Sequence, residues 1–190
     1  MKFSIMKDFS LGKFIVEVST IIFGVILALG VNEVREHYND EEIVNTALES
    51  IQIEIQKNRD FLNIRIPYYS AMIDTLDILI KKHGANEGLW SVSVPGFTGI
   101  NPPMLRNSSL QTAISTQAFS NMDYAVADNI SWVYSYQETY LKWVYIYFDA
   151  FVKKDKVTIK MLQNLFKEMA SVGKQLNVNY AELLNDLKEM

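Results

Sequence analysis

Aromatic side chains are concentrated between Tyr124 and Phe151, and this is the strongest local pattern in the sequence. The stretch holds ten aromatic residues, six of them tyrosines. Aromatic rings stack on apolar molecules and attract cations to their faces, while a buried phenol group needs a hydrogen-bond partner. Five of the rings are spaced 4, 4, 3 and 4 residues apart, as on one face of a helix: Trp132, Tyr136, Tyr140, Trp143 and Tyr147.

Three interpretations of this aromatic stripe differ in what covers the rings. We interpret it first as part of the core of a helical bundle. The alternatives are a pocket that stacks a small apolar or cationic ligand, and a face that packs against lipid or a second subunit. Trp90, in a separate glycine- and proline-rich stretch, joins the five rings as a candidate ligand or partner surface.

Residues suited to catalysis or metal binding are few. The two histidines, His37 and His83, are far apart in the sequence, there is no cysteine, and neither a HExxH pair nor a glycine-rich phosphate loop is present. We therefore expect no enzymatic activity, no metal and no cofactor. The net charge is −4 and the lysines and arginines are scattered, which argues against nucleic acid as a partner.

An apolar run, FIVEVSTIIFGVILALGV, occupies residues 14–31. As a helix its eighteen residues cover roughly 27 Å, close to the ~30 Å hydrocarbon core of a bilayer. Glu17 is an ionisable group in this run and therefore faces a partner or reaches the headgroups. Gly24 and Ala28 form a small-xxx-small pair, which lets two helices approach closely.

We interpret residues 14–31 as a transmembrane helix. Twelve of the eighteen residues are Phe, Ile, Val or Leu, and they contribute very roughly −4 to −7 kcal/mol against at most ~+3.5 kcal/mol for one carboxylate. A cleaved signal peptide and a buried helix of a soluble domain are the alternatives. The first thirteen residues hold Lys2, Lys7 and Lys13, whereas Arg35 is the only basic residue between the span and Lys57. This asymmetry places residues 1–13 in the cytoplasm and residues 32–190 on the other side.

The pattern after the span predicts an all-α domain, an antiparallel helical bundle joined directly to the anchor. Apolar residues recur at heptad spacing through Val44, Leu48, Ile51, Ile55 and Leu62, with Asn58 as a polar member of the seam. Pro67 is expected to end or kink this first helix, and a second is predicted from Tyr68 to His83. Gly84 and the three basic residues before it are typical of a helix end.

Residues 84–104 hold half of the glycines and three of the four prolines, which predicts a long loop containing a short extended piece near Trp90. A short helix capped by Asn107 or Ser108 is expected next, followed by a long helix over 121–153. A last helical region is predicted to begin at Asp155. We expect interruptions in it at Gly173 and at residues 177–179.

Two stretches resemble an uncharacterised family of bacterial single-pass inner-membrane proteins. The first is EVSTIIFGVILALGVNEVRE, and the second is NSSLQTAISTQAFSNMDYAVADNISWVYSYQETYL, which includes a Tyr-x-x-Gln segment at Tyr134–Gln137. The sequence departs from the family pattern at Leu110, where a Trp is expected, and at Gln117, where a Gly is expected. The resemblance implies a helical domain anchored in the bacterial inner membrane, and implies no activity. With residues 1–13 in the cytoplasm, as the lysine asymmetry indicates, residues 32–190 would lie in the periplasm.

Our first hypothesis for function is a non-enzymatic, membrane-anchored scaffold or a subunit of an oligomeric membrane complex. Its partners would be the lipid bilayer and either a second copy of the chain or another membrane protein, with Glu17, Gly24 and Ala28 as the association residues of the anchor. A small-ligand sensor that uses the Tyr/Trp helix beneath the 84–104 loop is the second hypothesis. A membrane-disrupting effector that oligomerises through its anchor is the third.

Overall fold

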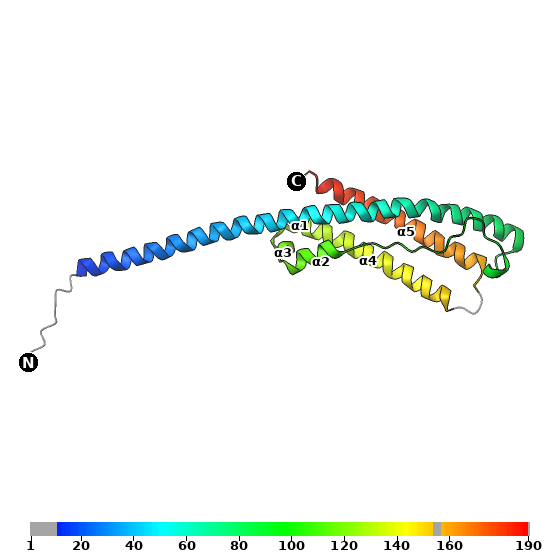
Figure 1. Ribbon diagram of the computed structural model, residues 1–190, viewed down its shortest axis with the longest axis horizontal. Helices are drawn as coiled ribbons and strands as arrows, with labels where there is room; N and C mark the ends of the chain where they lie inside the picture. Colours follow the sequence, from blue (N-terminus) through cyan, green and yellow to red (C-terminus); the bar gives the residue numbers. More distant parts are fainter. Residues whose placement is uncertain (1–10, 154–156, 190) are drawn as a thin grey trace, which may run out of the picture. The chain divides into compact units, whose positions relative to one another are not determined.

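The computed structural model describes residues 11–153 and 157–189, and within these ranges the chain is all-α, as predicted (Figure 1). Its elements are α1 (Leu11–His83), a 3-10 turn η1 (Leu89–Ser91), α2 (Ser108–Ser115), α3 (Ala118–Asn121), α4 (Tyr124–Val152) and α5 (Ile159–Asp186). The described residues include no strand. The extended piece expected near Trp90 is the turn η1, and Gly88 forms an isolated bridge with Thr158.

The chain divides into two compact units, Met1–Ile43 and Val44–Met190. In the first unit, the described part of α1 carries large apolar side chains that are all exposed from Phe14 to Val31. By its length and composition this helix could cross a membrane.

Helix α1 continues through Pro67, so the prediction of two separate helices at this point is wrong. Proline removes the hydrogen bond to the carbonyl of Asn63, but both residues are exposed and water can solvate that carbonyl. On the opposite side, Leu62, Tyr69 and Leu76 are fully buried. Their burial stabilises the continuation of the helix across the proline. The predicted end is confirmed: Gly84 follows His83 with φ +94°, a conformation that suits glycine.

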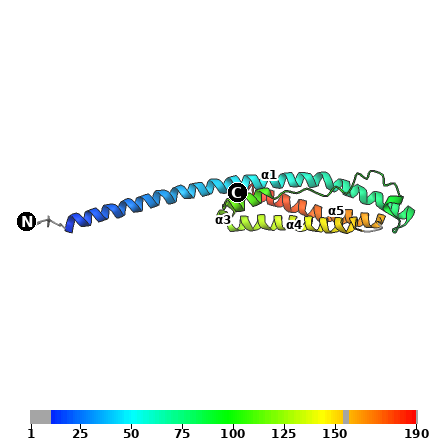
Figure 2. The same cartoon turned by 60° about the horizontal axis from the view of Figure 1, so that its bottom comes forward.

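In the second unit α4 runs parallel to α1, and α5 runs antiparallel to both. Glu54 and Asn58 of α1 bond to Tyr134 and Gln137 of α4, so the two helices advance in the same direction. Along α5 the order is reversed: Gln163 bonds to Asp77, Asn177 to Asn63, and the Leu187 carbonyl to Gln52. Figures 1 and 2 show these three helical segments side by side.

The predicted core face of α1 is confirmed in the bundle. Ile51, Ile55 and Leu62 are fully buried, while Val44 and Leu48, at the start of the second unit, are half-buried. Further along the chain the same helix buries Met72, Leu76 and Leu79 against the other segments. Heptad spacing therefore predicts the buried side of α1 correctly.

Helix α5 is continuous from Ile159 to Asp186, so the interruptions expected at Gly173 and at residues 177–179 are wrong. Gly173 is a point of close packing: a Cβ there would lie 3.3 Å from Tyr140 Oη and 3.7 Å from Ile66 Cγ1. Asn179 is buried within the helix and accepts a hydrogen bond from Gln175. Thr158 is the N-cap, and its hydroxyl accepts from Met161 N. The predicted cap, Asp155, lies outside the described residues.

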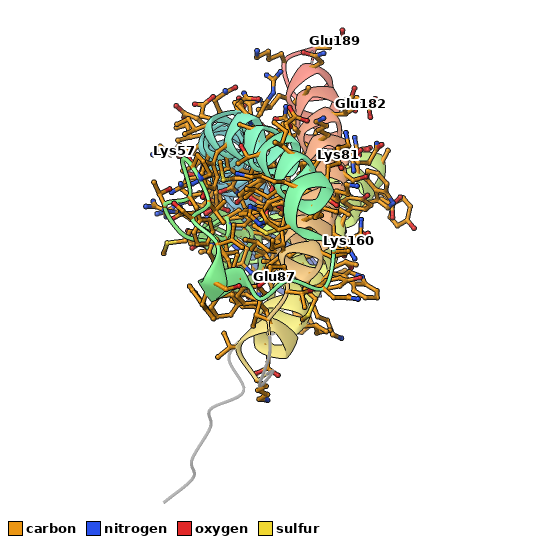
Figure 3. The ribbon with its side chains drawn as sticks, turned by 90° about the vertical axis from the view of Figure 1, so that its right-hand side faces the viewer. Lys57, Lys81, Glu87, Lys160, Glu182 and Glu189 are labelled. Atoms are coloured by element: carbon orange, nitrogen blue, oxygen red, sulfur yellow. The ribbon has the colours of Figure 1, made fainter. Side chains whose placement is uncertain are left out.

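The loop over residues 84–104 packs along α1. Tyr68 Oη donates to the Gly99 carbonyl at 2.6 Å, and Tyr69 Oη donates to the Asn101 carbonyl at 2.7 Å. At the loop's start, Ile159 N donates to the Glu87 carbonyl at 3.0 Å. Figure 3 views the molecule from this end, with Glu87 and Lys160 labelled. These bonds fasten the loop to α1 and to the start of α5.

Leu110 and Gln117, the two departures from the resembled family pattern, lie in α2 and between α2 and α3. Gln117 adopts φ +62°, a left-handed conformation that favours glycine, between α2 and α3. The long predicted helix begins at Tyr124, three residues later than expected, because Asp123 caps it by accepting from Ala125 N at 2.9 Å.

Candidate functional site

An apolar groove opens between α4 and α5, and aromatic rings form the α4 side of it. Tyr140, Trp143, Val144 and Tyr147 line this side, at successive positions on one side of the helix. Trp143 is 53% exposed and Tyr147 is 39% exposed. Their ring centroids are 6.1 Å apart with planes 33° apart. Two partly exposed rings, tilted against each other, therefore line the α4 side of the groove.

Helix α5 provides the other side of the groove through Leu165, Glu168, Met169 and Val172. The cavity volume is about 170 Å³. Glu168 is exposed at its edge and is the one charged side chain among the described lining residues. The groove thus combines an apolar, aromatic interior with a single negative charge. We call it the aromatic groove.

Tyr140 is the fixed base of the aromatic groove. It is 1% exposed, and its hydroxyl donates to the Met169 carbonyl at 3.2 Å. Burial raises the pKa of Tyr140 well above the ordinary tyrosine value, so the phenol stays neutral. Because its ring is almost wholly buried and its hydroxyl donates within the protein, Tyr140 contributes a fixed wall of the groove.

The other residues of the predicted surface lie apart from the groove. Trp132 and Tyr136 form a second pair on α4, with centroids 5.8 Å apart, and neither lines the groove. Trp90 is 78% exposed in the loop. The described lining of the groove comes from α4 and α5 alone and includes no residue of the 84–104 loop, so a ligand pocket beneath that loop stays a prediction.

The interpretation of the aromatic stripe as bundle core holds only for Tyr140. The buried positions of α4 follow a different line on the helix: Ile130, Val133, Tyr134, Gln137, Tyr140, Val144 and Phe151. This line and the aromatic stripe cross at Tyr140. The other stripe residues lie at the edge of the core, where a ring keeps one part on apolar neighbours and the rest in solvent.

The second half of α4 also carries exposed apolar side chains on both flanks of its buried line, while Lys142 and Asp149 occupy the side opposite the core. Tyr145, Ile146 and Val152 are 60%, 52% and 63% exposed, and Phe148 is 37% exposed. Together with Trp143 and Tyr147, these residues form what we call the outer α4 surface, and a group of large exposed apolar side chains marks a candidate interaction site.

A buried carboxylate, Glu54 of α1, organises the start of α2. Glu54 is 4% exposed and accepts hydrogen bonds from Tyr134 Oη at 2.7 Å, Ser108 Oγ at 2.6 Å and Ser109 N at 3.0 Å. The predicted cap residue Asn107 makes no side-chain cap bond, so Glu54 caps α2 from another helix. Burial, and then the bond to Glu54, raise the pKa of the Tyr134 phenol above its ordinary value.

One turn further along α1, Asn58 extends the same polar cluster. It is 2% exposed, its Oδ1 accepts from Arg106 N at 2.9 Å, and its Nδ2 donates to the Arg106 carbonyl at 2.8 Å. Gln137 Nε2 also donates to that carbonyl at 2.9 Å, and Tyr180 Oη donates to Gln137 Oε1. These bonds join α1, α4, α5 and the chain segment before α2. The cluster is satisfied within the protein, so it fixes the packing of the helices.

We did not predict this polar cluster, although the sequence contains a signal for it. Glu54 lies three residues after Ile51 and four before Asn58, so it falls on the predicted core face of α1. A carboxylate at such a position needs buried donors. Tyr134, Gln137, Ser108 and Ser109 all belong to the second stretch that resembles the membrane-protein family. Sequence spacing gave no means of joining that stretch to Glu54.

The three anchor residues lie on the exposed surface of α1. Glu17, Gly24 and Ala28 are all exposed, and nothing lies within 4 Å of a Cβ built at Gly24. Their association role therefore remains a prediction. Among the described residues, no group of three His, Cys, Asp or Glu side chains is arranged to hold a metal ion.

Comparison with protein-family models, with curated proteins and with solved structures gives no match for this chain.

Proposed function

We propose that this chain is a membrane-anchored helical protein that acts by binding, as a scaffold or as a subunit of an oligomeric membrane complex. The observation that carries the proposal is the exposure of large apolar side chains in two places, the run 14–31 and the outer α4 surface. Leaving such surface in water is unfavourable by about 25 cal/mol for each Å². A bilayer is the natural cover for the first surface and another polypeptide for the second.

The location that we propose is the bacterial inner membrane, with residues 1–13 in the cytoplasm and residues 32–190 in the periplasm. Three lysines before the span against Arg35 after it support this orientation. In sealed, inverted inner-membrane vesicles, added protease should leave the helical domain intact until detergent opens the vesicles. Digestion of the domain in sealed vesicles would show that the domain lies in the cytoplasm and would contradict the proposed orientation.

Site-specific photo-crosslinking of the full chain in native membranes tests the binding role. A photo-reactive residue in place of Ile146, on the outer α4 surface, should give one or a few discrete adducts. The matched control is the same residue in place of Asp128, an exposed position near the other end of α4. An adduct of twice the chain mass indicates a homo-oligomer, and another discrete mass indicates a different subunit. No discrete adduct from position 146, or equal adducts from position 128, would overturn the proposal.

The anchor has its own test within the same proposal. For this test a photo-reactive residue is placed in the span itself. If Gly24 and Ala28 form a helix-helix contact, Gly24→Leu should reduce the adduct formed from that position, because a large side chain separates the helix backbones. Leu27→Ala is the matched control, since Leu27 is another exposed residue of the span. An unchanged adduct in Gly24→Leu would remove the anchor from the association surface.

A small-ligand sensor is the second candidate, and the aromatic groove is the observation that favours it. The groove has a volume of about 170 Å³ and presents three aromatic rings. Drug-sized ligands need larger pockets, so the ligand of such a groove would be small. A thermal-shift screen of the full chain, with Trp143→Ala as the control, tests this candidate. A screen without hits, or with hits that Trp143→Ala leaves unchanged, would remove it.

A further inference from the structure

We infer that the aromatic groove binds a small alkylated ammonium ion, with a quaternary trimethylammonium group as the best fit. The inference deepens the second candidate function above and rests on it. It follows from the groove's size, its charge and its hydrogen-bonding capacity.

The volume of the aromatic groove restricts the ligand to a small group. An apolar cavity of about 150 Å³ is large enough for benzene, and the groove measures about 170 Å³. A trimethylammonium group with a short substituent is of this size. Larger parts of a ligand would have to extend outward past Trp143 and Tyr147, which are partly exposed.

The charge of the lining favours a cation. Tyr140, Trp143 and Tyr147 line the groove, and the face of an aromatic ring carries the negative part of its quadrupole. Glu168 adds a carboxylate at the edge, and the described lining includes no lysine or arginine. An anion would be repelled by each of these groups. A cation gains from both the rings and the carboxylate.

Hydrogen-bonding capacity selects among cations. A primary ammonium carries three N–H donors and loses free energy when they are buried without acceptors. Among the lining side chains the acceptors are Glu168 and two tyrosine hydroxyls, of which that of Tyr140 is buried against the Met169 carbonyl, and the neighbours on α5 other than Glu168 are apolar. A quaternary ammonium has no N–H donor, so its methyl groups can contact the rings and aliphatic side chains without leaving a donor unpaired.

Titration calorimetry on the detergent-solubilised full chain tests the inference, with phenyltrimethylammonium as the probe. The detergent should be uncharged and free of choline groups, such as a maltoside. tert-Butylbenzene, the neutral isostere, and benzoate, an anion, complete the panel. We expect binding of the cation, at least tenfold weaker binding of the neutral isostere, and none of benzoate.

Three variants assign the binding to the groove. Trp143→Ala should weaken cation binding about tenfold, because it removes a ring face. Glu168→Gln should weaken it about fivefold at low salt and less at high salt, since the carboxylate is exposed and screened. Glu182→Gln is the control: Glu182 is an exposed carboxylate fourteen residues further along α5, labelled in Figure 3, and its variant should bind as the parent does.

The outcomes separate this inference from the function on which it rests. If the neutral isostere binds as tightly as the cation and Trp143→Ala weakens both, the groove is a ligand site but the inference of a cation is overturned. If neither probe binds, both the inference and the sensor function fail. If the cation does bind, competition by mixed micelles that contain phosphatidylcholine or phosphatidylethanolamine identifies the source of the ammonium group. Competition by phosphatidylcholine alone indicates a lipid headgroup, and absence of competition indicates a free solute.

Discussion

At the scale of single residues, Glu54 has the most demanding environment in the helical domain. It is a carboxylate at 4% exposure that accepts three hydrogen bonds. One comes from Tyr134 of α4, and two come from the first turn of α2, the Ser108 hydroxyl and the Ser109 amide. A buried carboxylate is tolerated only with such partners, and the partners in turn depend on it. Glu54 therefore joins the start of α2 to α1 and α4 as well as capping that helix.

We predict that Glu54→Ala destabilises the domain by about 3 kcal/mol or more, because it leaves the hydroxyls of Ser108 and Tyr134 and the amide of Ser109 unpaired. For a chain of this size, that lowers the midpoint of thermal unfolding by roughly 6–12 °C. Thermal unfolding of the full chain, followed by tryptophan fluorescence, measures the change. Glu49→Ala removes an exposed carboxylate of the same helix and should change the stability by less than about 0.5 kcal/mol. Equal midpoints for the two variants would contradict the capping role of Glu54.

At the scale of elements, the close approach of α4 and α5 depends on Gly173. The absence of a Cβ lets the Tyr140 hydroxyl reach the Met169 carbonyl across the helix pair. Sequence propensity treats a glycine in mid-helix as a weakness of about 1 kcal/mol. Here the packing of two helices offsets that weakness, which is why α5 continues through the position.

We predict that the effect of Gly173→Ala changes sign with the residue at position 140. In the parent chain the new methyl group meets the fixed Tyr140 hydroxyl at 3.3 Å, so the substitution should destabilise by about 1–2 kcal/mol despite the better helix propensity of alanine. In a Tyr140→Phe background the hydroxyl is gone, and the ring carbon at 3.7 Å is at ordinary contact distance. There the same substitution should stabilise by up to about 1 kcal/mol.

A double-mutant cycle in urea measures this coupling between positions 140 and 173. Additive free energies for the two substitutions would show that Gly173 is not required for the packing of Tyr140.

At the scale of the whole helical domain, the core includes four buried tyrosines, whose hydroxyls need hydrogen-bond partners. Tyr69, Tyr134, Tyr140 and Tyr180 are each at most 4% exposed, and burial is the largest cause that raises the pKa of each. Each hydroxyl has a protein acceptor. The four tyrosines therefore contribute both apolar area and specific helix-to-helix bonds, and the core is stable only while they are neutral.

We predict steep alkaline unfolding as a consequence. In the unfolded chain these tyrosines ionise near pH 10, whereas in the folded domain their pKa values are higher, so the unfolded state loses protons first. Stability is complete below about pH 10 and is lost as pH rises further, by about 1.4 kcal/mol per pH unit for each tyrosine. Four together give roughly 5 kcal/mol per unit, so a domain of ordinary stability unfolds within about one to three units above pH 10.

Circular dichroism and the absorbance of tyrosinate at 295 nm, recorded on the same sample, follow this transition. Loss of helix in the domain and ionisation of the buried tyrosines should coincide. Tyr69→Phe should lower the dependence of stability on pH by about one quarter. Ionisation of the four residues before any loss of helix would contradict the prediction.

The sequence by itself determined the features that depend on neighbours along the chain. Periodicity gave the all-α class and the buried faces of α1, because side chains three and four apart share a side of any helix. The glycine and basic residues at 81–84 gave the end of α1. The apolar run 14–31 was evident as a helix long enough for a membrane.

The tertiary structure alone decided which of these local signals prevailed and which side chains met. Pro67 and Gly173 look like breaks in the sequence, but each lies in a continuous helix because contacts from other segments outweigh the local cost. The aromatic stripe looks like core, but only Tyr140 lies on the line that α4 buries. Glu168 and Trp143 line one groove, and Glu54 bonds to Ser108, only through the packing of distant segments. Such contacts depend on the relative rotation of whole helices, which spacing along one helix does not specify.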